Sequence, residues 1–228
     1  MPSRFGRFTN NQYYHIFNKS IDNQKPLINK NSSSYFLRLV NYYRHTNVRL
    51  CYSQAVRLLP EYKQRYFDSL DLTHEYKVDI LAYCLMPNHF HFLVKQKIDN
   101  GISSFMSNLL NGFTRYNNIL IQRKGPIFLP SFRSKIILNE EALIHVSRYI
   151  HINPLVAGII SNVEDIWNYP LSSAFYYYKD LSNLINTKLI LESSYFRGDK
   201  QKYIKFVENE AIHKITKSYV DHTEKWLR

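Results

Sequence analysis

Residues Val78–Lys97 read VDILAYCLMPNHFHFLVKQK, and this stretch decides the fold. Two apolar segments flank Met86-Pro87-Asn88, whose proline and asparagine are turn residues, so the sequence predicts a β-hairpin. The second strand opens with His89-Phe90-His91. Because side chains alternate between the faces of a strand, we expect both imidazoles on one face and Phe90 on the other. Such a pair suits half of a metal site or one wall of a catalytic pocket, although His-x-His also occurs by chance.

The segments around the hairpin alternate between strand and helix patterns. In chain order we expect a strand at Gln12–Lys19, a helix at Tyr35–His45, the hairpin, an amphipathic helix at Ser103–Gln122, a strand at Phe132–Leu138 and a helix from Glu140 to Pro154. Ser103 or Ser104 is the expected N-cap of the second helix, and Asn139 of the third. This order predicts a ferredoxin-like (RRM-like) α+β fold, in which an antiparallel sheet carries helices on one face.

Two segments fall outside this pattern. Cys51–Leu70 has a helical pattern that Pro60 interrupts, so we expect a helical insertion at about residues 46–75. Beyond about Tyr176 the chain is rich in tyrosine and lysine and reads as a helical extension. We therefore divide the chain into a main domain at residues 1–175 and a C-terminal helical extension at residues 176–228.

Composition indicates a globular protein with a polyanionic partner. A chain of 228 residues that is 45% hydrophobic and 15% aromatic can bury a core and is not disordered. Its net charge of +12 favours nucleic acid as the partner, with an anionic membrane surface as the second candidate. The N-terminus lacks an apolar signal segment, no apolar run is long enough to span a membrane, and the two cysteines form no disulfide framework. We expect a cytoplasmic, nucleoid-associated protein.

The charge is unevenly distributed along the chain. From Met1 to Pro60 the only acid is Asp22, against nine lysines and arginines, and Asn100–Asn139 contains no acid. Basic stretches that are interleaved with tyrosine and phenylalanine suit a groove that follows a nucleic-acid backbone and stacks bases. The sequence leaves open whether the two stretches converge on the face of the sheet opposite the helices.

The second half of a candidate site lies in the last helix of the main domain. Tyr149 and Asn153 are four residues apart and therefore share one helical face. A tyrosine can hold a phosphoryl group covalently, and a metal ion between two imidazoles and an amide oxygen would neutralise the phosphate oxygens. With 19 tyrosines in the chain, this spacing alone does not single out a nucleophile.

A resemblance to a known family connects the two halves. Tyr83–Val94 (YCLMPNHFHFLV) resembles the HUH segment of the single-tyrosine transposases, especially the REP-associated tyrosine transposases. Arg148–Gly158 (RYIHINPLVAG) is similar to the tyrosine-bearing helix of that family and the turn after it, and Tyr14–Lys19 to its first strand. The similarity extends over roughly Tyr13 to Tyr178.

This resemblance implies a strand transferase that acts on single-stranded or hairpin DNA through a 5′-phosphotyrosine intermediate. His89 and His91 match the metal-binding histidines, Tyr149 the nucleophile and Asn153 the third metal ligand, which is often glutamine in insertion-sequence transposases. The expected cofactor is Mg²⁺ or Mn²⁺, and the expected assembly is a monomer or a homodimer. The expected DNA-binding residues are Arg115, Arg123, Lys124, Arg133, Lys135 and Arg148.

Two other functions use the same residues differently. A catalytically inactive module on this fold would bind hairpin DNA or RNA, with the histidines as base or phosphate contacts and Tyr149 as a packing residue. A hydrolase with water as nucleophile would require carboxylates near the histidines, but the nearest acids are Asp79 and Asp99. His15, His45, His74 and His145 have no comparable partners and are expected to be structural or exposed. His151 lies roughly 200° around the helix from Tyr149 and is left outside the site.

Overall fold

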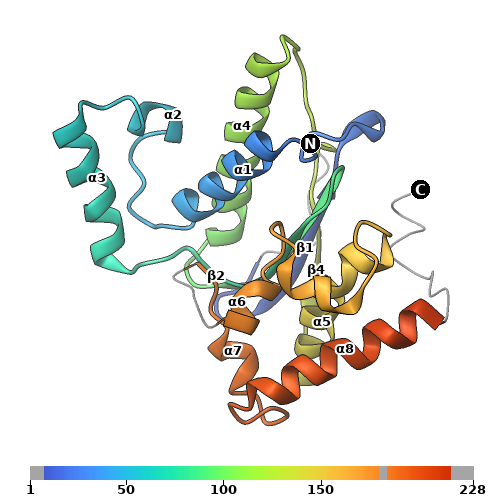
Figure 1. Ribbon diagram of the computed structural model, residues 1–228. Coiled ribbons are helices and arrows are strands. Elements are labelled where there is room, and N and C mark those ends of the chain that lie inside the picture. The colour runs from blue at the N-terminus through green and yellow to red at the C-terminus, as the bar shows by residue number, and fades with distance from the viewer. Residues whose placement is uncertain (1–7, 180–183, 217–228) are drawn as a thin grey trace.

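Four strands form one antiparallel sheet in the order β2–β3–β1–β4 (Figure 1). The computed structural model describes residues 8–179 and 184–216. The strands are β1 (Tyr13–Lys19), β2 (Val78–Leu85), β3 (His89–Gln96) and β4 (Arg133–Ile137). The predicted hairpin is β2–β3, and the histidine-bearing strand lies in the interior of the sheet between β2 and β1.

Helices α1 (Lys30–Tyr43) and α4 (Gly101–Leu120) pack side by side on one face of the sheet. Phe36 of α1 contacts the rings of Phe90 and Phe92 at centroid distances of 5.4 and 6.4 Å, which joins the helix to β3. These aromatic side chains are fully buried, so the core lies between the sheet and this helical pair. The ferredoxin-like fold expected from the sequence is confirmed.

The helix N-termini test the capping predictions. Asn139 accepts a hydrogen bond from the backbone N–H of Ala142, as expected for an N-cap. The prediction of a serine cap for α4 is wrong, because that helix begins at Gly101 after Asn100. The backbone N–H of Ile102 donates to Gln96 Oε1 at 3.1 Å, so the end of β3 satisfies a group that a cap residue would otherwise bind.

The expected helical insertion is present between α1 and β2. It consists of α2 (Tyr52–Ala55) and α3 (Pro60–Thr73), and Figure 1 shows it projecting to the side of the sheet. Pro60 occupies the first turn of α3, where its missing N–H has no helical partner to lose. The interruption predicted at this proline is therefore the start of a new helix.

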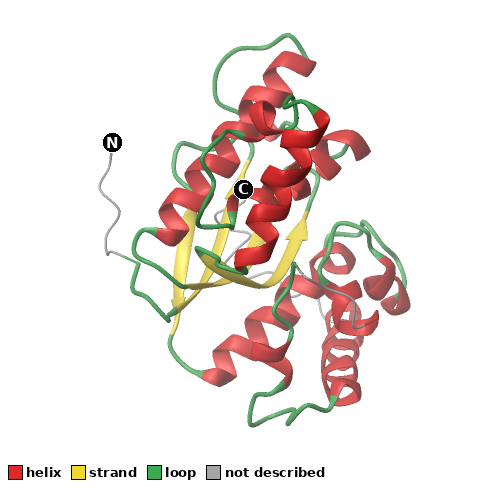
Figure 2. Ribbon diagram, turned by 90° about the vertical axis from the view of Figure 1, so that its left-hand side faces the viewer, coloured by secondary structure: helices red, strands yellow, loops and turns green. Residues whose placement is uncertain are grey.

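The helices are not confined to one face of the sheet as the sequence predicts, because α5 (Glu140–Val156) contacts β2 and β3 from the opposite face. Figure 2 shows helices on both sides of the sheet. Beyond α5 follow a short helix η2 (Val163–Asn168), α6 (Ala174–Lys179), α7 (Lys188–Leu191) and α8 (Lys200–Thr216), and α8 packs on α5. Residues 180–183 and 217–228 of the predicted extension lie outside the described residues. Within the described ranges, no helix combines the length and apolarity that crossing a bilayer requires.

Candidate active site

The two histidines of the hairpin lie together on the face of the sheet that α5 covers. Their ring centroids are 5.2 Å apart and their planes are perpendicular. His91 is fully buried, whereas His89, at the beginning of β3, is partly exposed. The alternation of side chains along β3 therefore gives the arrangement that the sequence predicts, with Phe90 in the core on the opposite face.

The structure places Tyr149 of α5 beside this pair. Its ring centroid lies 5.6 Å from that of His91, with an interplanar angle of 87°. Asn153 follows one helical turn later and is 8% exposed. Its Nδ2 atom is buried and has no hydrogen-bond partner among the described residues. The two segments that carry the predicted site residues thus meet between β3 and α5.

His15 is a member of this cluster that the sequence did not identify. Its Nε2 atom lies 3.0 Å from His91 Nδ1, and its ring centroid lies 5.9 Å from that of Tyr149. The expectation that His15 has no comparable partner is therefore wrong. The sequence contained a signal for His15, because the ferredoxin-like order places β1 next to β3. Phe17 of β1 pairs with His91, and His15, two residues earlier, lies on the same face of the sheet.

Hydrogen bonds determine which imidazole nitrogens are open. His89 Nδ1 lies 2.7 Å from Asn88 Oδ1, and an amide oxygen only accepts, so Nδ1 carries the proton and Nε2 has a lone pair. His91 Nδ1 is engaged by His15, while His91 Nε2 is buried and has no hydrogen-bond partner within the described ranges. Each histidine of the pair is thus oriented through Nδ1, which leaves its Nε2 for a ligand.

The surroundings keep these imidazoles neutral. Burial, with a smaller contribution from Lys19, lowers the pKa of His89 to about 4. Burial and then Lys135 lower the pKa of His15 to about 3. Burial, followed by the charges of its two histidine neighbours, holds the pKa of His91 well below the ordinary value. Neutral imidazole is the form that binds metal ions, so at neutral pH the cluster needs no deprotonation.

The predicted DNA-binding residues do not form one group. Arg133 and Lys135 are exposed on β4, and their register opposite Phe17 and His15 places them on the face of the sheet that carries the histidines. Lys19, which the sequence did not single out, is paired with His89 across the β1–β3 ladder. These three basic residues surround the cluster.

The remaining predicted DNA-binding residues lie elsewhere. Arg115 belongs to α4, and Arg123 and Lys124 follow it in the connection to β4. Arg148 is turned towards the C-terminal extension, where Nη2 lies 3.1 Å from Glu210 Oε2 and the guanidinium packs over Phe206. The structure thus separates Arg148 from the basic residues of β4.

His151 forms a second cluster on the other side of α5. Its Nε2 lies 2.8 Å from Ser173 Oγ, and its Nδ1 lies 2.8 Å from the hydroxyl of Tyr203 in α8. Burial lowers its pKa to about 3. His151 therefore lies outside the candidate site, as the sequence predicts.

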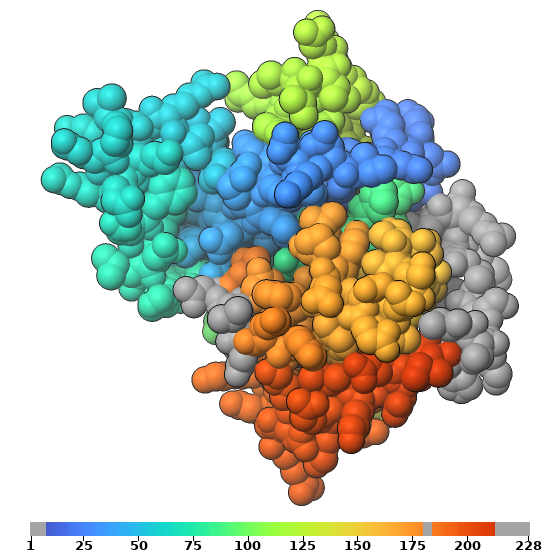
Figure 3. Space-filling view, viewed as in Figure 1, coloured from blue at the N-terminus to red at the C-terminus, as the bar shows by residue number. Residues whose placement is uncertain are grey.

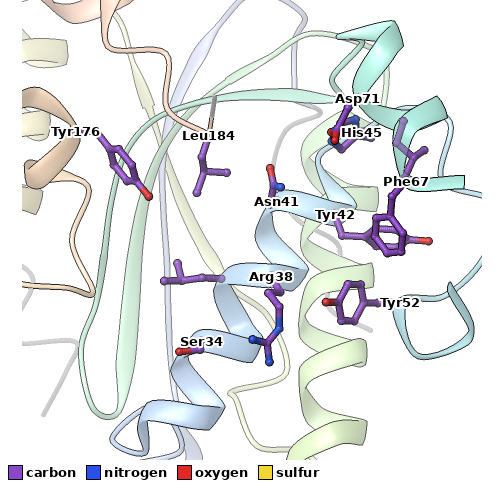
Figure 4. A pocket seen from close by; sticks show the side chains of 12 residues that line it. Ser34, Arg38, Asn41, Tyr42, His45, Tyr52, Phe67, Asp71, Tyr176 and Leu184 are labelled. Atoms are coloured by element: carbon purple, nitrogen blue, oxygen red, sulfur yellow. The ribbon is translucent and has the colours of Figure 1, made fainter. Parts of the chain in front are cut away.

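A pocket of about 790 Å³ opens between α1, the insertion and the segment around Leu184 (Figure 4). Arg38, His45 and Asp71 line it, and His45 Nε2 lies 3.7 Å from Asp71 Oδ1. None of the histidines or the tyrosine of the candidate site lines this pocket. It is a separate feature of the helical side of the molecule.

Comparisons with known proteins agree with the geometry. The family model described as "Transposase IS200 like" matches residues 39–153. Among solved structures, a REP-associated tyrosine transposase bound to a REP hairpin has a similar fold, with a TM-score of 0.52 and 16% sequence identity. The alignment covers 81% of this chain and 89% of that one. No curated protein matches the sequence.

Proposed function

Because the chain belongs to the family of IS200-like transposases, we propose that it cleaves and rejoins single-stranded DNA with Tyr149 as the nucleophile. The observation that carries this proposal is the position of the Tyr149 ring, 5.6 Å from His91 in a cluster of neutral imidazoles. Packing alone would not require two histidines whose Nε2 atoms are left for a ligand. The hairpin in the similar solved structure supports hairpin DNA as the substrate.

The residues of the cluster fit a divalent ion. Among the side chains that the structure describes, no three histidines, cysteines, aspartates or glutamates are grouped as metal ligands, and we look for the third ligand among other residue types. Asn153 is such a residue, because its orphaned amide exchanges oxygen and nitrogen when it turns by 180°. We propose that His89, His91 and Asn153 hold Mg²⁺ or Mn²⁺, which supplies Lewis-acid stabilisation of the phosphate charge.

The protein residues supply the nucleophile and its orientation. Tyr149 Oη forms a bond to a DNA phosphorus while the bond from phosphorus to the 3′ oxygen breaks. The phenol loses its proton and the departing 3′ oxygen gains one, which leaves a 5′-phosphotyrosine and a free 3′-hydroxyl. A second 3′-hydroxyl reverses the step, so no nucleotide hydrolysis is needed. Lys19, Arg133 and Lys135 bind backbone phosphates beside the site.

Helix α8, in the described part of the extension that we place at residues 176–228, holds the tyrosine helix in position. Tyr203 Oη donates to Ser147 Oγ at 3.1 Å, and Arg148 pairs with Glu210. Ser147 and Arg148 directly precede Tyr149, so both contacts fix the part of α5 that carries the nucleophile. The main domain, residues 1–175, then supplies the reacting groups.

The proposal is tested by incubating the protein with labelled single-stranded hairpins and Mn²⁺, followed by a denaturing gel. We expect a metal-dependent protein–DNA adduct that Tyr149→Phe abolishes while hairpin binding is retained. The matched control is Tyr62→Phe, which removes an exposed phenol oxygen of α3, away from α5, and should still form the adduct. Hairpin binding without any adduct, over many sequences, would instead support the inactive binding module.

A further inference from the structure

The two stretches of the sequence that are poor in acidic residues also meet on the face of the sheet opposite the histidines. They contribute α1 and α4, which approach closely at Gly112, where an added Cβ would lie 3.2 Å from the Tyr43 ring. The rings of Tyr35 and Tyr116 stack across the two helices with centroids 3.7 Å apart. The two stretches therefore do not converge on one face alone. Lys19, Arg133 and Lys135 lie beside the candidate active site, whereas α1 and α4 form a second basic, aromatic surface on the opposite face.

Three adjoining pockets run along this surface. The first, of about 520 Å³, lies between α1, α4 and the insertion, whose surfaces meet in Figure 3. The second follows the end of α4, and the third reaches the segment around Lys25. The first and second share Arg115, and the second and third share Arg123. We call this continuous surface the α4 groove.

The α4 groove carries positive charge along its length. Its basic side chains are Arg57, Arg115, Arg123, Lys124 and Lys25, and none of the described residues that line the three pockets is an aspartate or a glutamate. Ile119 and Leu120 lie among them with exposed fractions of 71% and 53%. Cationic side chains next to exposed apolar side chains suit single-stranded nucleic acid, which presents phosphates on one side and bases on the other.

The first pocket has a fixed aromatic wall. Four tyrosines line it: Tyr35, Tyr43, Tyr52 and Tyr116. Tyr52 meets the Tyr35 ring edge-on at 5.5 Å, and its backbone N–H donates to the Tyr43 hydroxyl. These contacts hold the rings in place, so a base that stacks on the wall has little side-chain ordering to impose. The insertion supplies Tyr52 to this aromatic wall and Arg57 to the lining of the same pocket.

The far end of the α4 groove leads to the candidate active site. The third pocket includes Lys25 and Pro26, and the next residue, Leu27, donates its backbone N–H to Pro87 O, two residues before His89. On the same side, the backbone N–H of Ser20 donates to Asn88 O. A DNA strand that extends from the histidine cluster can therefore pass over the β2–β3 turn into the α4 groove.

We propose that the α4 groove binds single-stranded DNA that extends from the strand held at the histidine–tyrosine site, with one base in the tyrosine-lined pocket. This inference rests on the proposed function, because it assigns a path to the same substrate. The phosphates follow the arginines and lysines, and the base stacks on the tyrosine wall. The insertion is then a substrate-binding element of this transposase.

Cys51 provides a direct test, because it is exposed at the edge of the first pocket while Cys84 is fully buried. Partial burial raises the pKa of the Cys51 thiol, but hydrogen bonds from Ser53 and Gln54 and the charge of Arg115 outweigh it and lower the pKa overall. In the Tyr149→Phe protein, an oligothymidylate of about 15 nucleotides should slow Cys51 alkylation by iodoacetamide about fivefold or more. A blunt duplex of equal length should not.

A second test compares two double variants by their affinity for oligothymidylate and does not depend on DNA cleavage. Arg57→Gln/Arg115→Gln should weaken oligothymidylate binding about tenfold and reduce its salt dependence. The control Arg65→Gln/Lys205→Gln removes two exposed charges outside the groove and should change binding less than about twofold. Unchanged alkylation at saturating oligothymidylate, or equal losses in both variants, would overturn the inference. An adduct that depends on Tyr149 without protection of Cys51 would refute the groove alone.

Discussion

Two buried histidine clusters lie on opposite sides of α5, and they differ in whether every nitrogen has a partner. His151 is hydrogen-bonded through both ring nitrogens, to Ser173 and Tyr203. His91 is bonded only through Nδ1, and its Nε2 is buried without a partner among the described residues. A buried polar atom without a partner costs about 1–3 kcal/mol, so the open nitrogen weakens the fold unless it binds something. Burial alone therefore does not distinguish a structural histidine from a functional one.

The largest expected effect separates the clusters by metal binding. His91→Gln should weaken Mn²⁺ binding by more than about a hundredfold, because it removes the open imidazole from the first coordination shell. His151→Gln should leave the Mn²⁺ affinity within about twofold, since its nitrogens are already occupied. Calorimetry or Mn²⁺ electron paramagnetic resonance gives both dissociation constants without DNA. Equal losses in the two variants would mean that the difference in hydrogen bonding has no functional meaning.

A smaller effect is expected at His15, which we propose orients His91. His15→Phe keeps an aromatic ring next to Tyr149 but removes the partner of His91 Nδ1. The Mn²⁺ affinity should fall between about ten- and a hundredfold, as for other residues that orient metal ligands. His15→Gln retains a side-chain acceptor and should recover part of the loss. If both variants bind Mn²⁺ like the unaltered protein, His15 has only a packing role.

The sequence predicted the fold and the placement of Tyr149 beside His91, but it did not predict the role of His15. The hairpin, the helix cap at Asn139 and the meeting of Tyr149 with His91 follow from local patterns and from the family's motifs. His15 was missed because its role depends on a neighbouring strand, 76 residues away, and not on its own segment. The serine cap was wrong for the same reason, since Gln96 supplies the acceptor from β3. Long-range hydrogen bonds are the part that a local pattern does not contain.

The smallest expected effect is on the pH dependence of the free energy of unfolding, and it should be the same for both histidine clusters. Burial lowers the pKa of His151 from 6.5 to about 3, so below about pH 6.5 the unfolded chain binds a proton that the folded chain excludes. The free energy of unfolding should therefore fall as the pH drops from about 6.5 towards about 3, by about 1.4 kcal/mol per pH unit for each such histidine. His151→Gln should remove one such contribution, measured by urea unfolding between about pH 7 and pH 5.

His15, whose pKa burial and Lys135 also lower to about 3, should behave in the same way when it is replaced by glutamine. The pH dependence responds to burial, which the clusters share, whereas Mn²⁺ binding responds to the open nitrogen, which only one of them has. An unchanged slope in His151→Gln would mean that His151 takes up a proton in the folded state. That result would contradict the assignment of His151 as a neutral imidazole that is hydrogen-bonded to Ser173 and Tyr203. The two histidine clusters would then be distinguished by the metal-binding measurements alone.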